Sequence, residues 1–254
     1  MEQIKSLVEQ LKPLTDKNNI VSKLQKINEC FLQNYMINIY GLKIYPVEIE
    51  IYYYKKHIFE DEICHRHDLQ KDEQHFGKLY FHRCGRSRKK EANIDISNRG
   101  GFDICIFQQS KQEENKEYYL SILIRGAYIK GKLYYMNKIL QYIIKSNKNY
   151  SNDCNENRVY LEGLEKKQES VLEKKDKNIT CENYILQPRI NNGKYFKKED
   201  YGEYAEYRLN TLMNKEEIYK DILDMKNKDS ISEPIRRHYK SKEFKLYKNL
   251  IYCS

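Results

Sequence analysis

Residues 47–54 are Val-Glu-Ile-Glu-Ile-Tyr-Tyr-Tyr, a run in which apolar and polar side chains alternate until the tyrosines begin. Because successive side chains of a β-strand point to opposite faces, the apolar ones are expected to face a core. These are Val47, Ile49 and Ile51. The opposite face then carries Glu48, Glu50, Tyr52 and Tyr54. Carboxylates beside aromatic rings on one strand face suit a pocket that holds a flat ligand and performs acid–base chemistry on it.

Helical spacing appears on both sides of this strand. Apolar residues recur at three- and four-residue steps in four segments: 3–12, 18–37, 131–146 and 214–226. Pro13 separates the first two, because proline interrupts a helix. The charged segment 164–178 has few apolar anchors, so it predicts a solvated helix or loop.

The remaining pattern predicts strands. Gly41 should end the N-terminal helical part, and strands are expected near 44–54, 78–83, 93–97, 102–108 and 117–125. Asn98-Arg99-Gly100-Gly101 indicates a hairpin turn. We therefore expect an α+β fold, a single domain with a curved, mainly antiparallel sheet packed by helices. Residues 1–40 would form an N-terminal helical segment packed on a main α+β domain of residues 41–254.

The charge balance and the cysteine content restrict the binding partners and the compartment that we expect for this protein. The 254 residues include 46 Lys and Arg against 37 Asp and Glu, and the net charge of +9 suits nucleic acid or another polyanion. An AT-rich genome that raises Lys everywhere would give the same excess. Seven cysteines without a Cys-x-x-Cys pair favour a reducing compartment. With no membrane-length apolar run and no signal-peptide pattern, we expect an intracellular protein, cytoplasmic or nuclear.

Glu48 and Glu50 are the first candidates for catalysis. Aromatic rings exclude water from a neighbouring carboxylate, and desolvation raises the pKa of a carboxyl group toward the range of a general base. Two carboxylates on an ordinary edge strand are also common, and they usually have no function. The alternation alone leaves both interpretations open.

Histidines and cysteines are concentrated between residues 64 and 84. The set that could supply four nitrogen or sulfur ligands to zinc is Cys64, His65, His67, His75, His82 and Cys84. Their spacing matches no zinc pattern that has a mechanistic reason. Surface or hydrogen-bonded histidines are therefore the competing interpretation.

Two further charges occur in apolar strands. Arg125 follows Ile122-Leu123-Ile124, where it either marks the point at which a strand reaches solvent or places a guanidinium at a pocket mouth. Asp103 points away from its neighbours Phe102 and Ile104, so it is either a satisfied buried acid or a second group that faces the pocket.

Five segments, taken in order, carry a family resemblance. They are Val47-Glu48-Ile49-Glu50-Ile51-Tyr52, Glu60-Asp61-Glu62-Ile63-Cys64-His65, Gly77-Lys78-Leu79-Tyr80-Phe81-His82, Gly101-Phe102-Asp103-Ile104-Cys105-Ile106 and Ile122-Leu123-Ile124-Arg125-Gly126. In this order they resemble the alkyladenine (3-methyladenine) DNA glycosylase family, as a divergent member would. The resemblance covers residues 44–127. A weaker similarity is found at Gln187-Pro188-Arg189-Ile190-Asn191.

The resemblance implies a base-excision enzyme that hydrolyses the N-glycosidic bond of a flipped, modified base in double-stranded DNA, without metal or cofactor. By position, Glu50 would activate the attacking water and Arg125 would contact the DNA backbone. Tyr52, His65 and His82 would stack on the base. Asp103 would read the hydrogen-bonding edge of the base. We expect a monomer that does not associate with membranes.

Three positions depart from the family pattern. Asp103 stands where the family has Asn, His82 where it has another aromatic ring, and Cys84-Gly85 where it has an intercalating tyrosine. Two alternatives therefore stay open. A non-catalytic DNA-binding module on the same scaffold would bind DNA with an affinity that falls steeply with salt. A metal-dependent nuclease would use the histidine and cysteine cluster and contain stoichiometric metal.

Overall fold

The computed structural model describes residues 1–61, 64–66, 75–84, 93–96, 100–107, 118–135, 137–147, 150–167 and 169–175, and the backbone of 184–188 and 209–213. Several predicted features lie outside the described residues: the helix over 214–226, His67, Gly85, the turn residues Asn98 and Arg99, and the segment from Arg189 to Asn191.

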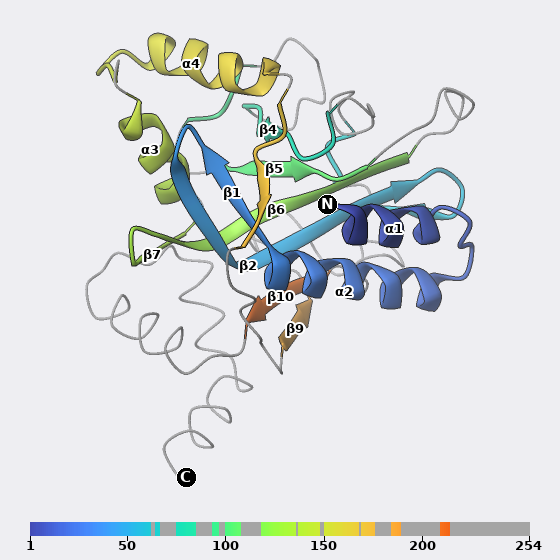
Figure 1. The fold of residues 1–254 in the computed structure, drawn as a ribbon. Helices are drawn as coiled ribbons and strands as arrows, with labels where there is room; N and C mark the ends of the chain where they lie inside the picture. The colour runs from blue at the N-terminus through green and yellow to red at the C-terminus, as the bar shows by residue number, and fades with distance from the viewer. Residues whose placement is uncertain are drawn as a thin grey trace.

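One curved antiparallel sheet forms the centre of the described structure (Figure 1). Its strands are β1 (Tyr35–Ile39), β2 (Leu42–Lys55), β3 (Phe59–Glu60), β4 (Leu79–Phe81), β5 (Phe102–Cys105), β6 (Tyr118–Ile129), β7 (Lys132–Tyr135), β8 (Leu172–Lys174), β9 (Tyr184–Pro188) and β10 (Leu209–Met213). The main order is β4-β5-β6-β2-β1-β8, with β3 and β10 also paired to β2, β7 to β6, and β9 to β10. The pairing of β2 with β6 shifts register on both sides of Glu48, and such bulges bend a strand.

The described helices share one core with one face of this sheet (Figure 1). They are α1 (Glu2–Leu11), α2 (Lys17–Asn34), α3 (Asn137–Ser146) and α4 (Cys154–Lys166). Asp16 caps α2, because its side chain accepts a hydrogen bond from the Asn19 N–H at 2.9 Å. The predicted α+β class, with a sheet packed by helices and an N-terminal helical layer, is confirmed.

The helix predicted over 18–37 is too long. α2 ends at Asn34, and the chain from Tyr35 forms β1, which pairs with β2 on one side and β8 on the other. Gly41 does not end a helix, because Tyr40 and Gly41, with φ of 51° and 87°, form the turn between β1 and β2. Pairing on both sides satisfies the backbone of this segment, and local spacing carries no information about those distant partners.

The segment 131–146 is also divided between two elements rather than forming one helix. β7 follows a turn at Lys130 and Gly131, whose φ values are 50° and 74°, and α3 begins only at Asn137. Positive φ at both turn residues is the geometry of a tight hairpin, so the chain reverses and pairs with β6 before the helix starts.

The alternation of residues 47–54 in β2 is confirmed, but neither face of this part of the strand is exposed. Ile49, Ile51 and Tyr53 lie in the core beneath the helices. On the other face a second apolar cluster contains Tyr52, Tyr54, Cys64, Tyr119 and Leu123. Glu48 and Glu50 are 6% and 0% exposed. The interpretation of these carboxylates as edge-strand residues is wrong, because β2 is a central strand with partners on both sides.

Candidate functional site

One row of side chains crosses the sheet on the face opposite the helical core. Glu50 of β2 pairs with Leu123 of β6, Leu123 pairs with Asp103 of β5, and Asp103 pairs with Tyr80 of β4. Cross-strand partners point to the same face of a sheet. The register therefore places two carboxylates and a phenol in one line, with Leu123 between the carboxylates.

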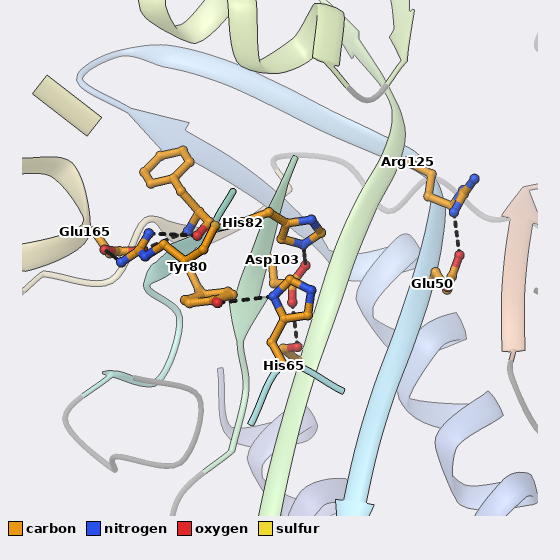
Figure 2. A network of polar contacts seen from close by, with 10 residues as sticks. Glu50, His65, Tyr80, His82, Asp103, Arg125 and Glu165 are labelled. Atoms are coloured by element: carbon orange, nitrogen blue, oxygen red, sulfur yellow. Dashed lines mark hydrogen bonds and ion pairs between the residues drawn. The ribbon is translucent and has the colours of Figure 1, made fainter. Parts of the chain in front are cut away.

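At one end of this row, Glu50 and Arg125 form a buried ion pair (Figure 2). Arg125 lies two residues after Leu123 on β6 and so shares its face. The Arg125 Nη1 donates to Glu50 Oε2 at 2.6 Å, and its Nε lies 3.8 Å from Glu48 Oε1. The side chains of Arg125 and Glu50 are 9% and 0% exposed. In the structure, the Arg125 guanidinium therefore contacts two buried carboxylates. The predicted contact of Arg125 with the DNA backbone stays a prediction.

Glycine is required next to Arg125. A Cβ at Gly126 would lie 2.8 Å from the Tyr135 ring and 3.3 Å from the Cβ of Glu48. The first distance is shorter than real contacts allow, so any side chain at this position would displace Tyr135. Gly126 therefore lets β7 pack closely beside the carboxylates.

Asp103 is a satisfied buried acid. Its Oδ1 lies 2.7 Å from His82 Nε2, and its Oδ2 accepts a hydrogen bond from Ser121 Oγ at 2.8 Å. Burial alone would raise the pKa of the Asp103 carboxyl. The charges of His82 and His65 and the hydrogen bonds from His82 and Ser121 outweigh burial, and the pKa is lowered from its ordinary value. The carboxylate is therefore held ionised by its neighbours.

His65 lies against the other aromatic groups of this cluster (Figure 2). Its Nδ1 is 3.1 Å from the Tyr80 hydroxyl, and its ring centroid is 4.6 Å from that of His82. Burial, followed by the charge of Asp103, raises the pKa of Tyr80 well above its ordinary value. Tyr80 therefore stays a neutral phenol. His65, Tyr80, His82 and Asp103 form one connected polar cluster.

Tyr52 lies beside this cluster rather than inside it. Its cross-strand partner on β6 is Ser121, the residue that donates to Asp103. The Tyr52 side chain is buried with Tyr54, Cys64, Tyr119 and Leu123. Arg66 closes over this group, with its guanidinium 4.7 Å from the centre of the Tyr54 ring. The site therefore has an aromatic wall next to its polar cluster.

Arg83 and Glu165 form a second ion pair, which the sequence did not reveal. Arg83 donates to both carboxylate oxygens, at 2.6 and 3.1 Å, and Glu165 Oε1 also accepts the Phe81 N–H at 2.9 Å. These hydrogen bonds of Glu165 connect α4 to β4, the strand that carries Tyr80 of the polar cluster. The prediction of a solvated helix or loop over 164–178 is wrong at Glu165, which is buried with a partner 82 residues earlier in the chain, and at Leu172–Lys174, which form β8. Lys166, Lys167 and Glu169 are exposed, as that prediction requires.

Five of the six predicted site residues form two groups on one face of the sheet (Figure 2), and Tyr52 lies beside them in the apolar cluster. Glu50 and Arg125 make the first, while His65, His82 and Asp103 belong to the second. Four members of the polar networks on this part of the sheet were not predicted: Tyr80, Arg83, Ser121 and Glu165. Strand alternation gives the face of Ser121, which matches that of Leu123, but no local signal indicates that its hydroxyl would meet Asp103.

The described cysteines and histidines are not arranged as metal ligands. Within the described ranges, no three His, Cys, Asp or Glu side chains are placed so that they could hold a metal ion. Cys64 is buried, which raises the pKa of its thiol, whereas Cys84 is exposed. His65 and His82 instead contact Tyr80 and Asp103.

Comparison with known proteins adds no identification. No protein-family model, no curated protein and no solved structure matches the chain at a significant level. None of the helices in the described part of the chain is long and apolar enough to cross a membrane. A functional proposal therefore rests on the chemistry of the residues in Figure 2.

Proposed function

We propose that this protein hydrolyses the N-glycosidic bond of a modified base in double-stranded DNA, with Glu50 as the general base. The observation that carries the proposal is the buried Glu50–Arg125 ion pair, 2.6 Å between Nη1 and Oε2, in the same row as the Asp103 cluster. Burying an ionised carboxylate costs free energy, and even a paired one contributes little net stability. A buried ion pair beside other titratable groups is therefore better evidence for a functional site than for a stabilising contact.

The reaction suits a carboxylate at this position. Cleavage of a glycosidic bond passes through a transition state in which positive charge develops at the anomeric carbon. Glu50 would accept a proton from the attacking water and would stabilise that charge electrostatically. Arg125 would fix the orientation of the carboxylate through its hydrogen bond to Oε2. The burial of both side chains supports such a water-poor site.

The aromatic wall would serve base recognition. An enzyme that acts on a base within a duplex must extrude the base and hold it by stacking and by hydrogen bonds to its edge. Tyr52 lies two residues after Glu50 on the same face, and His65 and His82 stand across β6 from it. The net charge of +9 would supply sequence-independent attraction to the phosphates.

The test is a screen of the full-length protein against duplex oligonucleotides that each carry one alkylated or deaminated base. We expect abasic sites, detected as alkali-induced strand breaks at the lesion, in at least one duplex and with EDTA present. The undamaged duplex of the same sequence is the control. Salt-dependent binding without an abasic site in any duplex would contradict hydrolysis and favour the non-catalytic module.

A further inference from the structure

The face of the sheet that carries Glu48 and Glu50 does not stay buried along its whole length. The pairing of β2 with β6 shifts register on both sides of Glu48, and beyond that shift Tyr45 of β2 lies directly opposite Tyr128 of β6. Each tyrosine stands between two buried residues of its own strand, yet both keep part of the side chain exposed. The tyrosine pair is therefore a point at which the sheet presents aromatic rings to solvent.

The register of the two strands puts both tyrosines on the face of Glu48. Gly126 pairs with Glu48, and a Cβ on Gly126 would lie 3.3 Å from that of Glu48, so the two positions share a face. Ala127, the next residue of β6, is 0% exposed in the helical core, and alternation then returns Tyr128 to the face of Glu48. Tyr45 shares that face because cross-strand partners point the same way. The tyrosine pair thus lies beside the buried carboxylates.

The two strands hold the rings in a fixed place. β2 and β6 run side by side (Figure 1), and they pair on both sides of the tyrosines, at Ile44 with Ile129 and at Pro46 with Ala127. Tyr128 also packs against the helical core. Rings that are held in this way lose little conformational freedom on binding a ligand, so more of the contact energy appears as affinity. The pair therefore suits a flat ligand that stacks.

The end of the sheet next to the tyrosines carries positive charge. The hairpin segments 40–47 and 126–135 meet there, because β2 pairs with β6 up to the turns. They contain Lys43, Lys130 and Lys132, all of them exposed, and their sequences hold no Asp or Glu. Lysines beside aromatic rings are the combination that binds a nucleic acid strand, since the ammonium groups attract phosphates and the rings stack on bases.

We infer that Tyr45 and Tyr128 form a stacking platform for an unpaired base of a nucleic acid strand, with Lys130 and Lys132 attracting its phosphates. The strand is single because a base inside a duplex already stacks on its neighbours and offers no free face to a ring. DNA and RNA share this chemistry. The inference goes beyond base excision and does not depend on it: the platform binds a strand whether or not Glu50 acts on a base.

The experiment measures, by fluorescence anisotropy, how the full-length protein binds two undamaged oligomers of about 15 nucleotides. One is oligothymidylate, and the other has the same phosphates but tetrahydrofuran in place of every nucleoside, so it has no bases. We expect Tyr45→Ala/Tyr128→Ala to bind oligothymidylate about 10- to 100-fold more weakly and the base-free oligomer nearly as the wild type does. Tyr45→Phe/Tyr128→Phe, which keeps both rings, should bind both oligomers nearly as the wild type does.

Two further variants separate stacking from charge. Tyr150→Ala is the matched control, because Tyr150 is 45% exposed and belongs to neither hairpin, and it should leave the binding of oligothymidylate unaltered. Lys130→Asn should weaken the binding of both oligomers alike and lower the slope of log affinity against log salt by about 0.7. Asn suits this turn position, where φ is 50°. Oligouridylate RNA in the same assay shows whether the platform also accepts ribose, and a loss in the Ala variant supports the inference for either strand.

Unchanged binding of oligothymidylate by the Ala variant, or an equal loss on both oligomers, would overturn the platform. So would a wild type that binds the two oligomers equally. If circular dichroism shows that the Ala variant does not fold, 5-iododeoxyuridine in the oligomer decides on the wild type. A photo-cross-link to Tyr45 or Tyr128, located by mass spectrometry, supports the platform, and cross-links at other residues alone contradict it. No base is released in these measurements, so the platform can fail while base excision stands, and the reverse.

Discussion

Replacing Glu50 by Gln is expected to slow base release by about 100- to 10,000-fold, the usual contribution of a general base. Gln keeps the size of the side chain and can still accept a hydrogen bond from Arg125, but it cannot take a proton from water. It also removes the negative charge that would stabilise the anomeric carbon in the transition state. The measurement is the single-turnover rate on the lesion that the wild type processes best.

The matched control is Glu169→Gln, the same substitution at an exposed position. It changes the net charge equally and should leave the rate unaltered. Circular dichroism and thermal unfolding of both variants separate loss of chemistry from loss of fold. A Glu50→Gln enzyme as fast as Glu169→Gln would show that Glu50 is not the base.

The Arg125→Met variant is expected to lose about 3–5 kcal/mol of the free energy of unfolding, the usual cost of removing one partner of a buried ion pair. Met preserves the length and apolar part of the side chain. Glu50, which is 0% exposed, would then be buried without the guanidinium 2.6 Å away, and Glu48 would lose the same neighbour. Urea unfolding followed by circular dichroism measures the change.

The double variant Glu50→Gln/Arg125→Met distinguishes charge from packing. Removing both partners abolishes most of the uncompensated charge, so the double variant should be more stable than Arg125→Met alone. If the two variants unfold at the same urea concentration, the loss comes from packing. The buried ion pair would then contribute little to the site.

The sequence predicted features that depend on local periodicity. The alternation of residues 47–54 correctly gave the two faces of β2, and the face of Asp103 followed from the same rule. Helical spacing correctly indicated α1 and most of α2. These predictions succeed because side-chain direction along one element is a property of that element alone.

Features that depend on partners distant in the chain could not be predicted. The burial of Glu50 follows from the central place of β2, which is set by strands on both sides of it. The bond between Asp103 and His82 joins residues 21 apart, and that between Arg83 and Glu165 joins residues 82 apart. No spacing rule connects such residues, so the polar cluster became visible only in the folded chain.

The most direct test of the central claim does not require the identity of the base. Duplexes that carry a cationic pyrrolidine or an uncharged tetrahydrofuran in place of one nucleotide differ only in charge near the anomeric position. If the Glu50 carboxylate faces that position, the wild type should bind the pyrrolidine duplex about 100-fold more tightly, as expected for a transition-state mimic, and Glu50→Gln should lose this preference. Equal affinity of the wild type for the two duplexes would contradict the account.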